Sequence, residues 1–125
     1  MISNQKFFNK VKTHLLKQGR KCKANTGKQV DGSPCMYFNP ADGTRCAVGG
    51  ALPMRVIKQI IKADLNHCGL SDIVKMPEVA ECLPPDHGLV EDLQSCHDSE
   101  RPIAWEKRLK EIAEEYDLEY EGAKT

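Results

Sequence analysis

The chain has no excess of charge of either sign and no long apolar run. Its 125 residues carry 18 basic and 18 acidic side chains, so the formal net charge is zero. This balance argues against a nucleic-acid partner held by bulk electrostatics. No stretch approaches the length of a transmembrane helix, and the segment Met-Ile-Ser-Asn-Gln-Lys-Phe-Phe lacks the apolar run of a signal peptide. We therefore expect a cytoplasmic protein that has no membrane partner.

Several motifs that carry chemistry are also absent. The six cysteines include no Cys-x-x-Cys pair, which removes the main signal for a zinc ribbon. The chain contains neither a Walker A motif nor Gly-x-Gly-x-x-Gly, and we expect no cofactor. Without a secretory signal, the cysteines are expected to be reduced thiols. A scattered structural zinc site stays open, with Cys35, Cys46, Cys96 and His97 as candidate ligands.

The stretch 35–53 concentrates the unusual residues of the chain. Cys35-Met-Tyr-Phe favours a strand, and Asn39-Pro-Ala-Asp-Gly43 is a dense turn signal. Residues 44–48 can return as a second strand, so the segment predicts a β-hairpin with a five-residue loop. The glycine pair at 49 and 50 then ends the strand. A helix follows, because Pro53 suits a first turn.

Apolar residues recur at helical spacing in four longer segments. Residues 4–18 form the first, which Gly19 ends. The others cover 53–67, 89–97 and about 99–118. The residues expected to form the core together are Ile57, Ile61, Trp105, Leu109 and Ile112.

These elements predict a single α+β domain over residues 1–125. It is mostly helical, with about four longer helices and one small β-hairpin. Residues 20–33 have no apolar period and are expected to form a loop or arm. Residues 77–83 could form a short helix, and residues 119–125 are expected to form a frayed tail.

Cys46, His97 and Asp98 are the catalytic candidates. A cysteine nucleophile needs a base to form the thiolate, and a nearby helix N-terminus would favour that form. His97 could be the base. Asp98 is adjacent in the sequence and orients such a histidine poorly, so Asn39 or Asn66 could orient it instead. The ordinary alternative is that Cys46 is a small buried residue and His97 a core histidine.

An anion site is the second possibility. Gly49 and Gly50 permit close approach to the backbone, the next helix offers N–H groups, and Arg45 and Arg55 lie nearby in the sequence. Such a site would hold a phosphate or a nucleotide. The ordinary alternative is that the glycines only turn the chain.

The hairpin motif resembles a pattern found in a family of small uncharacterised phage, prophage and bacterial proteins. The matching residues are Cys35-x-Tyr37 and Gly43-Thr-Arg-Cys-Ala-x-Gly49 with Leu52-Pro53, followed later by Leu93-Gln-x-x-His-Asp98. The resemblance implies a phage or mobile-element origin, but no activity. It also implies that the hairpin and the His-Asp helix share one site, which adds Tyr37 and Gln94 to the ligand-binding candidates.

Three hypotheses follow for function. The first is a small cytoplasmic accessory protein of phage type that binds a host protein or a small anionic, nucleotide-like ligand. The second is a cysteine-dependent enzyme with Cys46 as nucleophile and His97 as base. The third is a structural zinc-binding domain.

Overall fold

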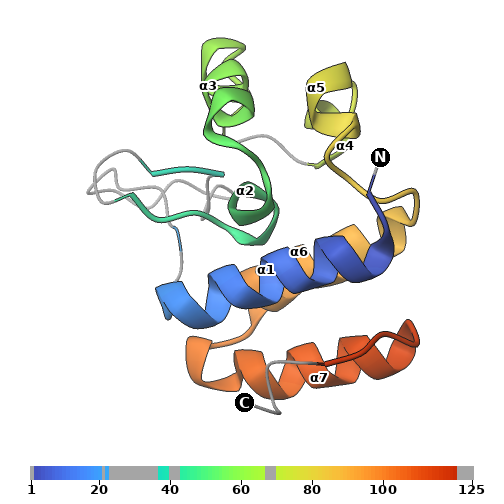
Figure 1. The fold of residues 1–125 in the computed structure, drawn as a ribbon. Coiled ribbons are helices and arrows are strands. Elements are labelled where there is room, and N and C mark those ends of the chain that lie inside the picture. The colour runs from blue at the N-terminus through green and yellow to red at the C-terminus, as the bar shows by residue number, and fades with distance from the viewer. Residues whose placement is uncertain (1, 21, 23–36, 40–42, 67–69, 121–125) are drawn as a thin grey trace.

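The computed structural model describes residues 2–20, 22, 37–39, 43–66 and 70–120. Within these ranges the chain forms seven α-helices. The bounds are α1 Asn4–Gln18, α2 Ala47–Ala51, α3 Met54–Lys62, α4 Leu70–Ile73, α5 Pro77–Ala80, α6 His87–Ser99 and α7 Trp105–Glu115, with the 3-10 turn η1 at Pro102–Ala104. Helices α1, α6 and α7 pack together, α2 lies on α1 and α6, and α3 to α5 extend on the side of α2 away from α7 (Figure 1).

The predicted α+β class with a β-hairpin is wrong. The described residues contain no strand, and one isolated antiparallel bridge joins Phe38 to Arg45. The expected return strand stops at once because the chain enters α2 directly after Cys46. The glycine pair lies inside this helix instead of ending a strand. Residues 35, 36 and 40–42 of the predicted hairpin lie outside the described residues.

Helix α1 has the predicted bounds, and its sequence explains both ends. The Ser3 side chain accepts a hydrogen bond from the Lys6 N–H at 3.1 Å, which caps the N-terminus. Gly19 adopts a left-handed conformation with φ of 70°, and its N–H bonds to the Leu15 carbonyl. The helix buries Phe7, Phe8, Val11 and Leu15.

The later helices differ from their predicted bounds. Helix α3 ends at Lys62, short of residue 67, which itself lies outside the described residues. Ser99 is the last residue of α6 and does not cap α7, because Pro102 begins the 3-10 turn η1 between the two helices. Glu119 was predicted to lie in a frayed tail. Its N–H and carbonyl bond to the Gln5 side chain, at 2.8 and 3.0 Å, and residues 121–125 of the predicted tail lie outside the described residues.

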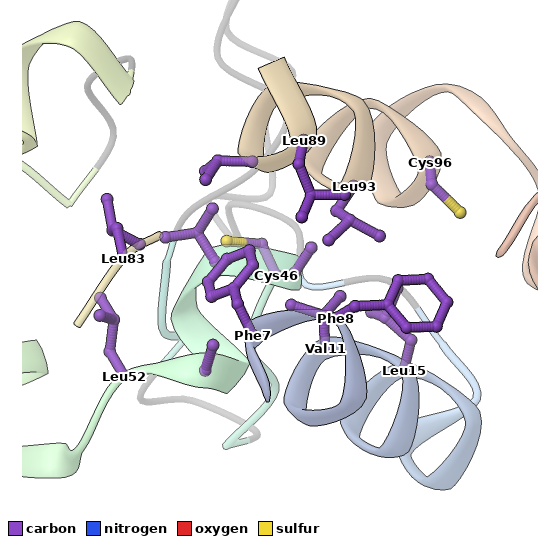
Figure 2. Packing of buried hydrophobic residues seen from close by; sticks show 14 of the residues in the cluster. Phe7, Phe8, Val11, Leu15, Cys46, Leu52, Leu83, Leu89, Leu93 and Cys96 are labelled. Carbon is purple, nitrogen blue, oxygen red and sulfur yellow. The ribbon is translucent and has the colours of Figure 1, made fainter. Parts of the chain in front are cut away.

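Every α-helix contributes side chains to one apolar cluster. Figure 2 shows side chains of α1, among them Phe7 and Val11, facing Leu89 and Leu93 of α6, with Cys46 between them. Ile57, Trp105, Leu109 and Ile112 are buried as predicted, but the prediction for Ile61 is wrong, since its side chain is 42% exposed. The apolar stripe of α3 is broader than the face that the rest of the molecule covers.

Candidate functional site

His97 is fully buried near the end of α6, and both of its ring nitrogens are hydrogen-bonded. Its Nδ1 lies 2.8 Å from Oδ1 of Asp98, and its Nε2 lies 3.0 Å from the main-chain nitrogen of Cys22. Its ring stacks on Trp105 of α7, with ring centroids 5.6 Å apart. Asp98 therefore does orient its sequence neighbour, contrary to the expectation that adjacent side chains diverge.

These contacts determine the tautomer of His97. The Cys22 N–H can only donate, so Nε2 must accept and the ring proton must lie on Nδ1, where it is donated to Asp98. The lone pair that a general base would use is therefore bonded to the main chain of Cys22. In this arrangement His97 joins α6 to the Cys22 segment.

Asp98 and Gln94 extend this hydrogen-bonded chain to α2. The Gln94 Nε2 donates to Oδ1 of Asp98 at 3.0 Å, and the Gln94 Oε1 accepts the main-chain N–H of Val48 at 3.0 Å. Val48 lies in the first turn of α2, whose N–H groups have no partners within the helix. We call the chain Cys22–His97–Asp98–Gln94–Val48 the α6 polar network. It brings the predicted hairpin segment and the His-Asp helix together.

Cys46 is the N-cap residue of α2. Its sulfur accepts a hydrogen bond from the Gly49 N–H at 3.3 Å, and its side chain is 1% exposed within the core. A cap of this kind satisfies one of the free N–H groups of the helix. This contact gives the buried cysteine a structural reason to be there.

Arg45 is held by its main chain from α1. The Gln18 side chain bonds both the Arg45 N–H, at 2.8 Å, and the Arg45 carbonyl, at 2.9 Å. His14 Nε2 also donates to this carbonyl at 3.1 Å. Burial lowers the pKa of His14, and the charge of Arg45 acts in the same direction, whereas the hydrogen bond to the Arg45 carbonyl opposes this fall. The half-buried Arg45 guanidinium donates to the Leu52 carbonyl at 3.3 Å and lies over the Phe38 ring.

Asn66 holds Phe38 in the same manner from the other side. The Phe38 N–H donates to Asn66 Oδ1 at 3.2 Å, and Asn66 Nδ2 donates to the Phe38 carbonyl at 2.8 Å. Phe38 and Arg45 are the two residues of the isolated bridge. Two side-chain amides thus take the positions that neighbouring strands would have in a sheet.

Gly49 and Gly50 are needed for packing. A β-carbon on Gly49 would overlap the main chain of Tyr37, and one on Gly50 would overlap the His14 ring. Tyr37 is itself 6% exposed, and its N–H donates to the Asn66 carbonyl at 3.2 Å. These packing contacts explain why Tyr37, Gly49 and Gly50 occupy their positions without any ligand. A ligand at this site stays a prediction. Arg55 lies elsewhere, exposed on α3.

The candidate metal ligands that the structure describes do not cluster around a common point. Among the described residues, no three His, Cys, Asp or Glu side chains lie where they could share a metal ion, and Cys35 is outside those residues. Cys96 is a free, buried thiol, and burial raises its pKa to about 12. Because metals bind the thiolate, this environment is unfavourable for a ligand.

Local patterns did not predict the contacts of four residues that build this region, namely His14, Gln18, Cys22 and Asn66. Each takes part in a bond between a side chain and main chain far apart in the sequence, such as the bond from the Cys22 N–H to the His97 ring, 75 residues away. An amide or imidazole that bonds distant main chain leaves no period or motif in the sequence. Of the α6 polar network, only the Gln-x-x-His-Asp spacing could be recognised in the sequence.

No protein-family model, curated protein or solved structure matches the chain. The resemblance to phage proteins therefore stays a prediction. Within the described ranges, no helix is both long enough and apolar enough to cross a membrane.

Proposed function

We propose that this chain is a small, non-catalytic accessory protein of phage or mobile-element type, which acts in the cytoplasm by binding an acidic host protein through the exposed face of α3. The contacts of Cys46 and His97 support a binding role over the cysteine-enzyme hypothesis. The Cys46 sulfur caps a helix and the His97 Nε2 accepts a main-chain N–H. The two atoms that would act as nucleophile and base are therefore engaged in structural hydrogen bonds.

The observation that carries the proposal is the composition of the outer side of α3. Three exposed cations lie there, and the helix contains no acidic residue. They are Arg55, Lys58 and Lys62. Their spacing places them on one side of the helix. Met54 and Ile61 are the apolar members, 36% and 42% exposed. We call these five side chains the α3 face.

Within the part of the chain that the structure describes, no ion pair neutralises the cations of the α3 face. Among the described residues, none of the three forms an ion pair, whereas α7 pairs Arg108 with Glu111 and Glu115, and Lys110 with Glu106. Since the whole chain is neutral, this local excess of positive charge belongs to one surface and not to the protein in general. Unpaired cations around apolar side chains complement an acidic surface with an apolar centre.

A protein fits this face better than the other anionic partners. Met54 and Ile61 are only partly exposed, which leaves little apolar surface to insert into a bilayer. Three cations form a small footprint for nucleic acid, and the face carries no aromatic side chain on which bases could stack. The predicted small-anion site, with Arg45 and Arg55, would not involve the exposed Ile61 side chain.

Site-specific photo-crosslinking tests the proposal. A benzophenone amino acid placed at position 61 should crosslink to a protein in the bacterial cell. The same residue at position 103, where Ile103 is 91% exposed on η1, should not. Reversal of charge by Arg55→Glu, Lys58→Glu and Lys62→Glu should remove the crosslink. The crosslinked peptide of the partner should be rich in Asp and Glu.

A matched control separates local charge from net charge. Lys6→Glu, Lys10→Glu and Lys17→Glu change the total charge equally on the exposed side of α1 and should leave the crosslink intact. Equal loss in both triple variants would contradict the proposal. Crosslinking to lipid or nucleic acid would also contradict it. So would a protein crosslink that survives the α3 reversal. Binding of inorganic phosphate or ATP that Arg45→Ala abolishes, without any crosslink at 61, would favour the small-ligand alternative.

A further inference from the structure

The two halves of the chain carry opposite charges. Residues 1–63 contain 12 basic and two acidic side chains, whereas residues 64–125 contain six basic and 16 acidic ones. The net charge of zero is therefore the sum of a basic half and an acidic half. The basic half contributes the α3 face, and the acidic half contributes residues 70–86, which include α4 and α5. We call residues 70–86 the acidic segment.

The acidic segment matches α3 in charge. It holds four carboxylates and a single cation, Lys75, so its formal charge is equal and opposite to that of α3. The carboxylates belong to Asp72, Glu78, Glu81 and Asp86. Three of them are exposed, and Glu78 is half-buried. Val74 and Met76, which are only partly buried, lie between them in the sequence, just as two apolar side chains lie among the cations of the α3 face.

In the described part of the chain, the two surfaces do not neutralise each other. Among the described residues, no ion pair joins the α3 face to the acidic segment, and none of the four carboxylates forms one elsewhere. Both surfaces belong to helices that lie on the side of α2 away from α7 (Figure 1). A two-fold rotation can therefore bring each α3 face onto the acidic segment of another copy.

We propose that two copies of this chain pair through these surfaces, so that each α3 face binds the acidic segment of the other copy. The two contacts are identical by symmetry, and each joins opposite charges. An acidic host protein on the α3 face would leave the acidic segment uncovered, whereas a second copy covers both surfaces at once. The second copy thus masks the α3 face until a host protein displaces it. This regulation rests on the proposed function, but the pairing itself is tested on the purified chain.

Sedimentation velocity of the purified chain measures the pairing. A reducing buffer excludes a disulfide through Cys82, a free thiol within the acidic segment. Exposed ion pairs are individually weak, so the dissociation constant at low salt should be on the order of 100 µM. Salt screens such contacts, and the dissociation constant should rise at least about tenfold between about 20 mM and about 300 mM NaCl. A chain that is still monomeric at about 1 mM, a dimer that salt does not weaken, or an assembly larger than two chains would overturn the proposal.

Reversal of charge on one surface at a time identifies the contact. Lys58→Glu with Lys62→Glu makes the α3 face acidic, and Asp72→Lys with Glu81→Lys makes the acidic segment basic. Either variant alone should lose the dimer, because like charges then meet in both contacts. An equimolar mixture of the two variants should restore a dimer, since each contact again joins opposite charges. Native mass spectrometry identifies this heterodimer by its mass.

Lys6→Glu with Lys10→Glu is the matched control, because it changes the net charge as the α3 reversal does but on the exposed side of α1. It should dimerise like the unmodified chain and form no heterodimer with the Asp72→Lys, Glu81→Lys variant. Far-UV circular dichroism shows that each variant is folded. A mixture of the two reversed variants that stays monomeric would overturn the proposal, as would an equally weak dimer of the α1 control. Loss of the host crosslink beside an intact dimer would overturn the proposed function alone.

Discussion

Gly50 of α2 lies so close to His14 of α1 that a β-carbon at position 50 would enter the space of the imidazole ring. The His14 ring of α1 therefore packs directly against the main chain of α2 at this point. The same approach allows His14 to reach the Arg45 carbonyl. The glycine pair that resembled an anion-binding turn thus permits a close helix contact.

Gly50→Ala should destabilise the protein by roughly 1–3 kcal/mol, because the added methyl group overpacks this contact. Urea unfolding followed by circular dichroism measures the change. In a His14→Ala background the ring is gone, so the same substitution should cost much less. An equal cost in both backgrounds would show that the overlap with His14 is not the cause.

Cys46 should behave as a helix cap and not as a nucleophile. Cys46→Ser retains an acceptor for the Gly49 N–H, whereas Cys46→Ala removes it. The free energy of unfolding of the Ala variant should therefore be lower than that of the Ser variant by roughly 0.5–2 kcal/mol. Iodoacetamide should label native Cys46 slowly near neutral pH. Rapid labelling that His97→Ala suppresses would restore the enzyme hypothesis.

Ile57 and Ile61 provide a matched pair on one helix. Ile57 is fully buried, so Ile57→Ala should cost roughly 2–5 kcal/mol through the cavity that it leaves. Ile61 is 42% exposed, and Ile61→Ala should change stability by less than about 1 kcal/mol. The denaturant midpoints of the two variants show whether their losses of stability differ as expected. Similar losses would place Ile61 in the core after all.

Alkaline pH should weaken the fold through Cys96. Burial raises the pKa of this thiol from an ordinary value of 9.0 to about 12 in the folded protein. Above pH 9.0 the unfolded chain loses the proton while the folded protein keeps it, so stability present below that pH falls as pH rises toward 12. Unfolding curves measured across this range should show the decline.

Cys96→Val should reduce the slope of that decline. Tyr116 contributes in the upper part of this range, because its hydroxyl donates to Asp92 at 2.7 Å and its pKa is raised from an ordinary 10.0 to about 12. Tyr116→Phe is therefore measured in parallel. A slope that neither substitution changes would exclude both groups as its origin.

The sequence predicts best where neighbours along the chain determine the structure. Helix α1 is bounded by Ser3 and Gly19, both within one turn of its ends, and its apolar spacing identifies the buried face. The hairpin prediction failed because α2 begins directly after Cys46, which leaves a single bridge between Phe38 and Arg45. His97 was identified as unusual, but its role depends on an N–H at Cys22, which no local pattern reveals.

The amides of Gln18 and Asn66 have a consequence for self-association. An unpaired strand edge presents N–H and carbonyl groups on which a second chain can pair, and this is a common route to aggregation. At Arg45 and Phe38 those outward groups are already bonded to Gln18 and Asn66. At these two positions, two side chains thus block the pairing of a second chain with the main chain.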